Sequence, residues 1–201
     1  MCTAYELGKR GGSFPDRVNA EAIGILSEIL ETRLIRPILP APVITAEGEL
    51  ETMRWGFHRP FSHVIVNSRE DKLESVVWKK AMAEHRCLIP AAAYYEWSGP
   101  KGNKRTHRFT QVAGEWLWIA GIWEENAELG RCFSMITTQA NSRVVGIHDR
   151  MPAVLRTAEI GSFLDGGLAT FKPVSESLRV GDAPNPLRKK KKEPPAQGEL
   201  F

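Results

Sequence analysis

Apolar residues recur at helical spacing near the start of the chain. Ile23, Leu26, Leu30 and Leu34 stand three or four positions apart, with acidic residues between them. This spacing puts one apolar stripe on a helix surface and predicts an amphipathic helix over 19–34. Shorter helices are predicted over 73–85, 139–145 and 157–164.

Runs rich in aromatic and β-branched residues predict more strands than helices. The clearest are 115–123 and 132–138, which a polar loop separates. Three prolines keep 36–44 extended, because proline fixes its own φ and pushes the preceding residue away from helical angles. Further strands are predicted over 51–57, 62–67, 86–89, 94–97, 108–111 and 170–174. Many strands with a few flanking helices indicate an α+β fold built mainly of antiparallel β-sheets.

The composition fits one globular domain followed by a tail. The chain has 201 residues, of which 42% are hydrophobic. From about residue 181 the sequence turns to Pro, Asn, Lys and Gln, which cannot bury a core. We therefore expect a domain over 1–180 and a disordered, basic, proline-rich tail over 181–201.

The net charge of +3 comes from this tail. Residues 183–201 carry five basic and two acidic residues, which leaves 22 of each over 1–182. The overall charge therefore predicts no basic face on the domain. The sequence also has no run of about 18 apolar residues and no region typical of a signal peptide. We expect a cytoplasmic protein that does not contact a membrane.

The three cysteines, Cys2, Cys87 and Cys132, form no C-x-x-C pair. Their number is odd and they lie far apart in the sequence, which argues against a disulfide framework and against a cysteine-rich zinc site. Cys87 and Cys132 stand in strand-like surroundings, where a cysteine usually behaves as a small buried apolar residue. We expect no metal and no other cofactor, and Cys2 remains the candidate for chemistry.

Cys2 directly follows the initiator methionine. Met1 is normally removed when the second residue is small, and Cys2 would then carry a free α-amine beside its thiol. The ordinary pKa values of these groups are roughly 8 and 8.5. An aldehyde can condense with the amine to an imine, and the thiol can then close a five-membered thiazolidine ring. The alternative is an incidental cysteine at the second position.

Other polar residues in distinctive surroundings complete a candidate site. Glu96 stands among aromatic residues of a predicted strand, where burial would raise the pKa of its carboxyl group and suit it to proton transfer. His148 opens a polar cluster, and Asn67 ends an apolar strand. Residues of these types also occur as surface charges, loop motifs and ordinary turn residues, so both interpretations stay open for each one.

Several motifs occur together in a specific order. From the N-terminus they are Met1-Cys2, Trp55-Gly56, Asn67-Ser68-Arg69, Arg86-Cys87-Leu88-Ile89-Pro90, Tyr95-Glu96-Trp97, Ile136-Thr137-Thr138-Gln139-Ala140-Asn141 and Ile147-His148-Asp149-Arg150-Met151-Pro152. Over about the first 175 residues the chain resembles the SOS-response-associated peptidase (SRAP) family. Members of that family shield abasic sites in single-stranded DNA by covalent attachment through an N-terminal cysteine. The resemblance implies a barrel-like fold and a role in the DNA damage response, and we expect a monomer associated with the nucleoid or replication fork.

The resemblance implies a role for each matching residue. Cys2 would attack the open-chain aldehyde of an abasic deoxyribose, and Asn67 would hold the Cys2 terminus or the sugar. Glu96 would move protons during sugar ring opening and imine formation. His148 would support the imine chemistry, contact the adjacent phosphate and assist reversal. The sequence Thr3-Ala4-Tyr5 departs from the usual Gly-Arg-Phe, so an arginine expected beside the site is missing.

Other matching positions would contact the DNA. Arg69 and Arg150 would bind backbone phosphates, because a guanidinium fork fits two oxygen atoms. Thr137 would add a hydroxyl group at the site. Pro40 would line the cleft, and Phe61 would stack in place of the tryptophans that other members carry.

The last five residues form a second candidate site. Gln197 followed by Leu200 and Phe201 resembles the short motif by which bacterial replication and repair proteins bind the sliding clamp. In that mode Leu200 and Phe201 would fill an apolar pocket and Gln197 a polar one. The alternative is an inert tail, since a pentapeptide easily matches by chance.

Three functions are consistent with these patterns. The leading hypothesis is an abasic-site sensor that forms a reversible thiazolidine crosslink to single-stranded DNA through Cys2, with lyase-like imine chemistry. The family name suggests the alternative, an N-terminal-nucleophile cysteine peptidase or hydrolase that uses Cys2 with His148 and Glu96. The third is a noncatalytic DNA-binding module, whose affinity would survive the loss of Cys2.

Overall fold

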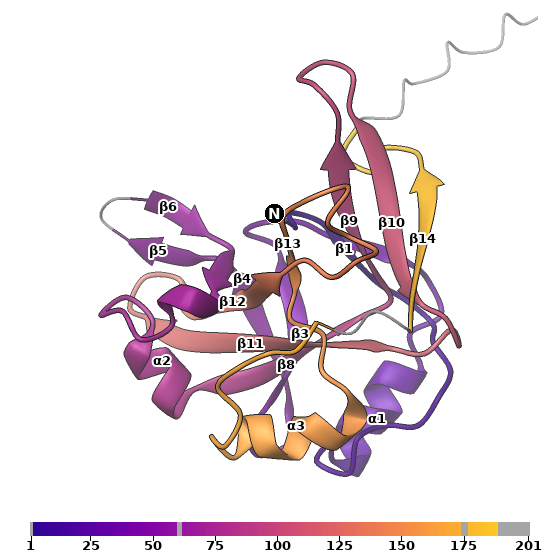
Figure 1. Ribbon diagram of the computed structural model, residues 1–201. Helices are drawn as coiled ribbons and strands as arrows, with labels where there is room; N and C mark the ends of the chain where they lie inside the picture. Colours follow the sequence, from indigo (N-terminus) through magenta and orange to yellow (C-terminus); the bar gives the residue numbers. More distant parts are fainter. Residues whose placement is uncertain (1, 60–61, 174–176, 189–201) are drawn as a thin grey trace, which may run out of the picture.

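The computed structural model describes residues 2–59, 62–173 and 177–188, and its centre is a closed barrel of five strands (Figure 1). The barrel strands are β3 (Pro40–Thr45), β4 (Leu50–Trp55), β8 (Arg86–Ala91), β11 (Leu117–Asn126) and β12 (Gly130–Gln139). Their order is β11-β8-β3-β4-β12, and β12 pairs back onto β11 to close the ring. The β4–β12 pair is parallel, whereas the other neighbours in the ring are antiparallel.

The barrel is filled by large apolar side chains. Trp55 and Phe133 are fully buried and stack with ring centroids 6.3 Å apart. Close packing also surrounds Gly121, because a β-carbon at this position would lie 3.0 Å from the sulfur of Cys87. Cys87 and Cys132 are buried free thiols, as the sequence predicts.

A second sheet stands beside the barrel and carries the N-terminus. Its strands, in order, are β14 (Leu178–Ala183), β10 (Arg105–Gln111), β9 (Ala93–Ser98), β1 (Tyr5–Leu7) and β2 (Arg33–Ile35). All neighbouring strands of this sheet run antiparallel. A single residue separates β8 of the barrel from β9 of this sheet. The long β9–β10 hairpin projects beyond the rest of the molecule (Figure 1).

Short elements surround these two sheets. The short strands are β5 (Phe57–Arg59), β6 (Ser62–Ile65), β7 (Asn67–Arg69) and β13 (Arg150–Pro152). The helices are α1 (Ala20–Ser27), α2 (Lys79–Glu84), α3 (Thr157–Leu164) and the 3₁₀ helix η1 (Glu70–Lys72). Both β7 and β13 pair with β12, so one barrel strand holds the segments that contain Asn67 and Arg150.

The α+β class, the largely antiparallel sheets and the barrel-like form are confirmed, but several predicted elements are wrong. The helix expected over 19–34 ends at Ser27, because Leu34 lies in β2 and pairs with Glu6 of β1. Only 79–84 is α-helical within the helix expected over 73–85. The strand expected over 170–174 does not form among its described residues, 170–173.

The helix predicted over 139–145 is also wrong, because Gln139 ends β12 and 142–145 form turns. The side chain of Asn141 accepts hydrogen bonds from the backbone N–H groups of Arg143 and Val144, which offers the backbone an alternative to a helix. At the C-terminal end, β14 runs to Ala183, three residues beyond the expected domain end, because Ala183 still pairs with Thr106. The helices of the described chain are too short or too polar to reach across a lipid bilayer.

Candidate functional site

Cys2 lies at the start of the chain, where the second sheet meets the barrel. It is fully buried, and its thiol donates to the carbonyl oxygen of Ala4 at 3.4 Å. The same carbonyl accepts the backbone N–H of Tyr95 at 3.1 Å. The chain next to Cys2 is therefore held against β9, the strand that carries Glu96.

Asn67 fixes the backbone of Cys2 directly. Its side-chain Nδ2 donates to the carbonyl oxygen of Cys2 at 2.8 Å. Asn67 itself is held in place because it pairs with Met135 of β12 and because the indole N–H of Trp55 binds the preceding carbonyl, that of Val66, at 3.0 Å. Its other amide atom, Oδ1, is buried and accepts no hydrogen bond from the described residues, so it is available to a hydroxyl or ammonium donor.

Glu96 is a buried carboxyl group beside Cys2. Burial raises the pKa of Glu96 from its ordinary value of 4.5 to about 7, and the positive amino terminus of the chain opposes this rise. Smaller effects come from the negative charge of Asp149, which raises the pKa, and from Lys104, which lowers it. A carboxyl group with a pKa near neutrality can both donate and accept protons at physiological pH.

The thiol of Cys2 is strongly biased towards its protonated form. Burial and the negative charge of Glu96 raise the pKa of the Cys2 thiol to about 12. The positive amino terminus lowers this pKa, and it also lowers the pKa values of Glu96 and His148. Charges change a pKa appreciably over about 4–6 Å, so these three side chains, which the same charge at the start of the chain affects, belong to one site.

His148 follows a turn-rich segment, and its ring lies against the next two residues. Its Nδ1 accepts the backbone N–H of Arg150 at 3.0 Å and lies 2.7 Å from Oδ1 of Asp149. Burial and the positive amino terminus lower the pKa of His148. The contact with Asp149 acts in the opposite direction, but the net effect favours the neutral imidazole. Because Nδ1 accepts the N–H of Arg150, the proton of the neutral ring is assigned to Nε2.

Two arginines and one carboxylate form a cluster next to this site. Arg69 is half-exposed and forms two hydrogen bonds with Asp71, at 2.7 and 3.0 Å. Arg150 is buried, donates to the backbone and hydroxyl oxygens of Thr137 and lies 3.3 Å from Asp71. A cavity of about 550 Å³ is lined by both arginines and Asp71. We call Arg69 and Arg150 the arginine pair.

Comparison with known proteins assigns the chain to a family. The sequence profile described as “SOS response associated peptidase (SRAP)” matches residues 1–185. The chain belongs to the SRAP family. The expectation drawn from its motifs is therefore confirmed.

Curated relatives and solved structures agree with this SRAP assignment. “Abasic site processing protein YoqW” of Bacillus subtilis is 32% identical over 124 residues, which cover 55% of this chain and 54% of that protein. “Abasic site processing protein HMCES” of Xenopus tropicalis is 28% identical over 170 residues, which cover 68% and 50%. The chain thus spans about half the length of these curated relatives.

Two crystal structures show the same fold at low sequence identity. A protein from Bacteroides thetaiotaomicron superposes with a TM-score of 0.72 and 22% identity, over 92% of this chain and 93% of that chain. A protein from Bordetella bronchiseptica gives a TM-score of 0.69 and 21% identity, over 92% and 100%.

The structure of this SRAP protein brings Cys2, Asn67, Glu96 and His148 together, with the arginine pair and Thr137 beside them. Pro40 is exposed at the first position of β3, opposite Arg54. The remaining predicted residues lie outside the described parts of the chain, and they are Phe61, Gln197, Leu200 and Phe201.

Three residues of the site were not found from the sequence. Asp71 pairs with both arginines, Lys104 affects the pKa values of Glu96 and His148, and Trp55 holds the segment before Asn67. The sequence did offer a signal for Asp71, which stands two positions after Arg69. Lys104 lies in a basic turn between two predicted strands, where nothing in the local pattern points to Glu96.

Proposed function

We propose that this SRAP protein recognises abasic sites in single-stranded DNA and, once Met1 has been removed, binds them covalently through Cys2. The observation that carries the proposal is the 2.8 Å hydrogen bond from Asn67 to the carbonyl oxygen of Cys2. The carbonyl carbon, the α-amine and the thiol side chain of Cys2 are all attached to one Cα atom. A single hydrogen bond to this backbone therefore orients both nucleophiles, which favours an intramolecular ring closure.

The electrostatics favour attack by the amine before the thiol. The thiol of Cys2, with a pKa of about 12, is protonated at neutral pH, whereas an α-amine has an ordinary pKa of about 8. A fraction of the amine is thus neutral and nucleophilic near pH 7. Glu96, with a pKa of about 7, can accept the proton that the amine must lose.

The proposed reaction has two stages, formation of an imine and closure of a ring. The amine nitrogen of Cys2 adds to C1′ of the open-chain deoxyribose, and its lost proton passes through Glu96 to the aldehyde oxygen. A second proton transfer releases that oxygen as water and leaves an imine. The sulfur then adds to the imine carbon, the thiol proton moves to the nitrogen through Glu96, and a thiazolidine ring results. The net change joins an aldehyde and an aminothiol with the loss of one water molecule.

Neighbouring groups fit the sugar and the phosphates around this reaction. The unused Oδ1 of Asn67 can accept a hydrogen bond from a sugar hydroxyl. Neutral His148, with a proton on Nε2, can donate to a phosphate or to the departing oxygen. The arginine pair beside Thr137 can bind the phosphates next to the lesion once Asp71 is displaced.

The chemistry of Cys2 distinguishes this proposal from a thiol peptidase. A cysteine nucleophile of a peptidase needs a stabilised thiolate, which a nearby positive charge normally supplies. At Cys2, burial and the carboxylate of Glu96 instead raise the pKa of the thiol. The surroundings therefore favour a neutral thiol that adds to an imine over a thiolate that attacks a peptide bond.

Incubation with an oligonucleotide that contains one abasic site tests the proposal. A covalent band on a denaturing gel is expected for the wild-type protein and is expected to vanish for Cys2→Ala. A variant with an extension before Cys2 lacks the free α-amine and should form no thiazolidine. Cys132→Ala, which removes another buried thiol, is the matched control and should retain the adduct.

Two results would contradict the proposal. The first is the absence of a Cys2-dependent adduct together with cleavage of peptides, which would indicate the peptidase. The second is a full yield of adduct from the extended variant, which would exclude ring closure through the α-amine.

A further inference from the structure

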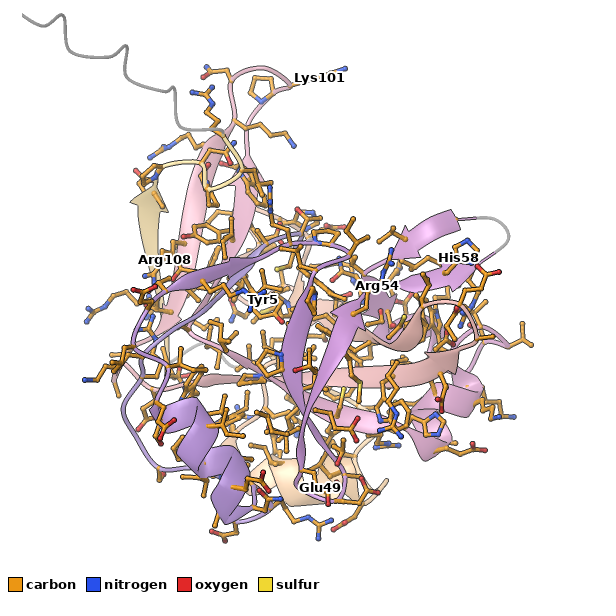
Figure 2. The ribbon with its side chains drawn as sticks, turned by 180° about the vertical axis from the view of Figure 1, so that it is seen from behind. Tyr5, Glu49, Arg54, His58, Lys101 and Arg108 are labelled. Carbon is orange, nitrogen blue, oxygen red and sulfur yellow. The ribbon has the colours of Figure 1, made fainter. Side chains whose placement is uncertain are left out.

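The β9–β10 hairpin concentrates positive charge in a domain that is neutral overall. Residues 99–110 contain Lys101, Lys104, Arg105 and Arg108 and no Asp or Glu. The hairpin extends beyond the barrel, and Figure 2 shows Lys101 at its outer end. Such a local excess of charge creates a field for anions that the net charge of the domain does not reveal.

A groove lies between this hairpin and the segment that follows β14. It has a volume of about 590 Å³, with Lys104 and Arg105 on the hairpin side and Asn185 and Arg188 on the other. Arg105 is neutralised by Asp182, whose carboxylate lies 2.7 Å away. Within the described residues, neither Lys104 nor Arg188 forms an ion pair. We call this feature the hairpin groove.

The lining of the hairpin groove suits phosphate and sugar better than bases. None of the described residues that line it is aromatic, so a base would find no ring on which to stack. Lysine, arginine and asparagine side chains are the usual donors to phosphate oxygens. Arg188 also directly precedes Lys189–Lys192, so four more positive charges follow it in the sequence.

The hairpin groove is connected to the Cys2 site through β9 and β10. Glu96 pairs with His107 of β10, and the neighbouring residue Thr106 lines the groove. Lys104 also lowers the pKa values of both Glu96 and His148, which requires it to lie near them. A DNA strand with its lesion at Cys2 can thus pass along the hairpin without leaving the protein surface.

We propose that the hairpin groove binds the phosphates of the DNA strand that continues from the abasic nucleotide. The inference rests on the proposed function, because it takes Cys2 as the position of the lesion. Lys104 and Arg188 contact phosphates of the flanking nucleotides and supply affinity that does not depend on sequence. The groove is a binding site for the strand and takes no part in bond formation.

Salt-dependent binding of full-length protein to single-stranded oligonucleotides tests this site. Each probe contains a tetrahydrofuran analogue of an abasic site, which has no aldehyde and therefore binds reversibly. The short probe has a single nucleotide on each side of the analogue, and the long probe has long flanking sequences. For the double variant Lys104→Gln/Arg188→Gln, weaker binding to the long probe is expected. The slope of log affinity against log salt should become less steep by about 0.7 for each phosphate that the variant no longer neutralises.

Two lysines provide matched controls. Lys101→Gln removes one positive charge from the same hairpin, but Lys101 is not part of the groove lining. Lys79→Gln removes one positive charge from α2, which lies on the opposite side of the molecule from the hairpin (Figure 1). Both variants should keep the wild-type slope with the long probe, because neither lysine binds a phosphate of the strand in the groove.

The outcomes separate this inference from the proposed function. An unchanged slope for the double variant on the long probe overturns the groove. An equal weakening on both probes also overturns it, because the charges would then act through the Cys2 site. If wild-type protein forms no adduct with a true abasic oligonucleotide, the proposed function fails, whatever the slopes of the analogue probes are.

Discussion

Replacement of Glu96 by glutamine is expected to stabilise the folded protein at neutral to alkaline pH. The carboxyl group is 1% exposed, and burial raises its pKa from 4.5 to about 7. Glutamine has nearly the same shape but never carries a charge. The substitution therefore isolates the unfavourable free energy of holding an ionised carboxylate away from water in the folded protein.

The magnitude and its direction follow from proton linkage. Between pH 4.5 and about 7 the folded protein holds the Glu96 proton more tightly than the unfolded chain does. The free energy of unfolding of the wild type consequently falls as the pH rises through this range. One pKa unit corresponds to about 1.4 kcal/mol, so the loss is about 3 kcal/mol in total. This contribution is fully present below pH 4.5 and is lost above about pH 7.

Chemical denaturation of both proteins over a range of pH provides the assay. Other ionisable groups cancel in the difference between Glu96→Gln and wild type, which should grow by about 3 kcal/mol from about pH 4 to about pH 8. The corresponding increase in relative melting temperature is about 6–12 °C for a domain of this size. Glu84→Gln, which removes an exposed carboxylate of α2, is the matched control.

A stability difference that is the same at both ends of the pH range would refute the reasoning. The carboxylate of Glu96 would then ionise as easily in the folded as in the unfolded chain, and its suitability for proton transfer would lose its physical basis. If the reasoning holds, Glu96→Gln should be the more stable protein at pH 8 and the slower one in adduct formation.

Four further substitutions, of which the last is a control, probe other parts of the structure. Asn67→Ala leaves a buried carbonyl without its 2.8 Å donor and should cost about 1–3 kcal/mol in urea denaturation, with slower adduct formation on the gel. Asp71→Asn removes the carboxylate that competes with DNA phosphates for the arginine pair. Because exposed ion pairs are weak, binding of single-stranded DNA should tighten by less than about tenfold in a fluorescence titration. Weaker binding would mean that Asp71 positions the arginines. Gly48→Ala would place a β-carbon 2.0 Å from the carbonyl oxygen of Arg17 at a φ of +86°, and it should lower the free energy of unfolding by about 3 kcal/mol or more in calorimetry. Gly114 has a similar φ of +73° but lies in open space, so Gly114→Ala should lower it by only about 1–2 kcal/mol. Equal losses at the two glycines would contradict the role of the close approach at Gly48.

Local sequence patterns predict the longer strands because their side chains alternate over many residues. The strand predicted over 115–123 overlaps β11 and the one predicted over 132–138 lies within β12, and these two strands pair with each other. The short strand β1 was missed, since three residues carry too little pattern and β1 forms only because β2 and β9 flank it. The helix expected over 19–34 is too long for the same reason, because pairing in the sheet outweighs helical spacing in its second half.

The candidate site is predictable where chemistry identifies a residue and unpredictable where only packing does. Cys2 and Glu96 could be singled out, one by its two nucleophiles and the other by its aromatic neighbours, and the structure places them together. The contact of Trp55 with the segment before Asn67 depends on barrel closure, which no local pattern records. The pairing of Asp71 with Arg150 likewise joins residues 79 positions apart.

Strand β12 completes the barrel and also carries one half of the site. It pairs with β4 and β11 in the ring and with β7 and β13 at the site. The pairs with β4 and β7 join residues far apart in the sequence, such as Cys132 with Arg54 and Met135 with Asn67. Pairing over such long separations is slow to form and is disrupted only when much of the fold unfolds. A partly folded chain in which β12 is still unpaired therefore lacks the hydrogen bond from Asn67 that holds the backbone of Cys2. In the proposed reaction, capture of the aldehyde is therefore coupled to the integrity of the whole domain, and the amides of β12 should be among the last to exchange with deuterated solvent.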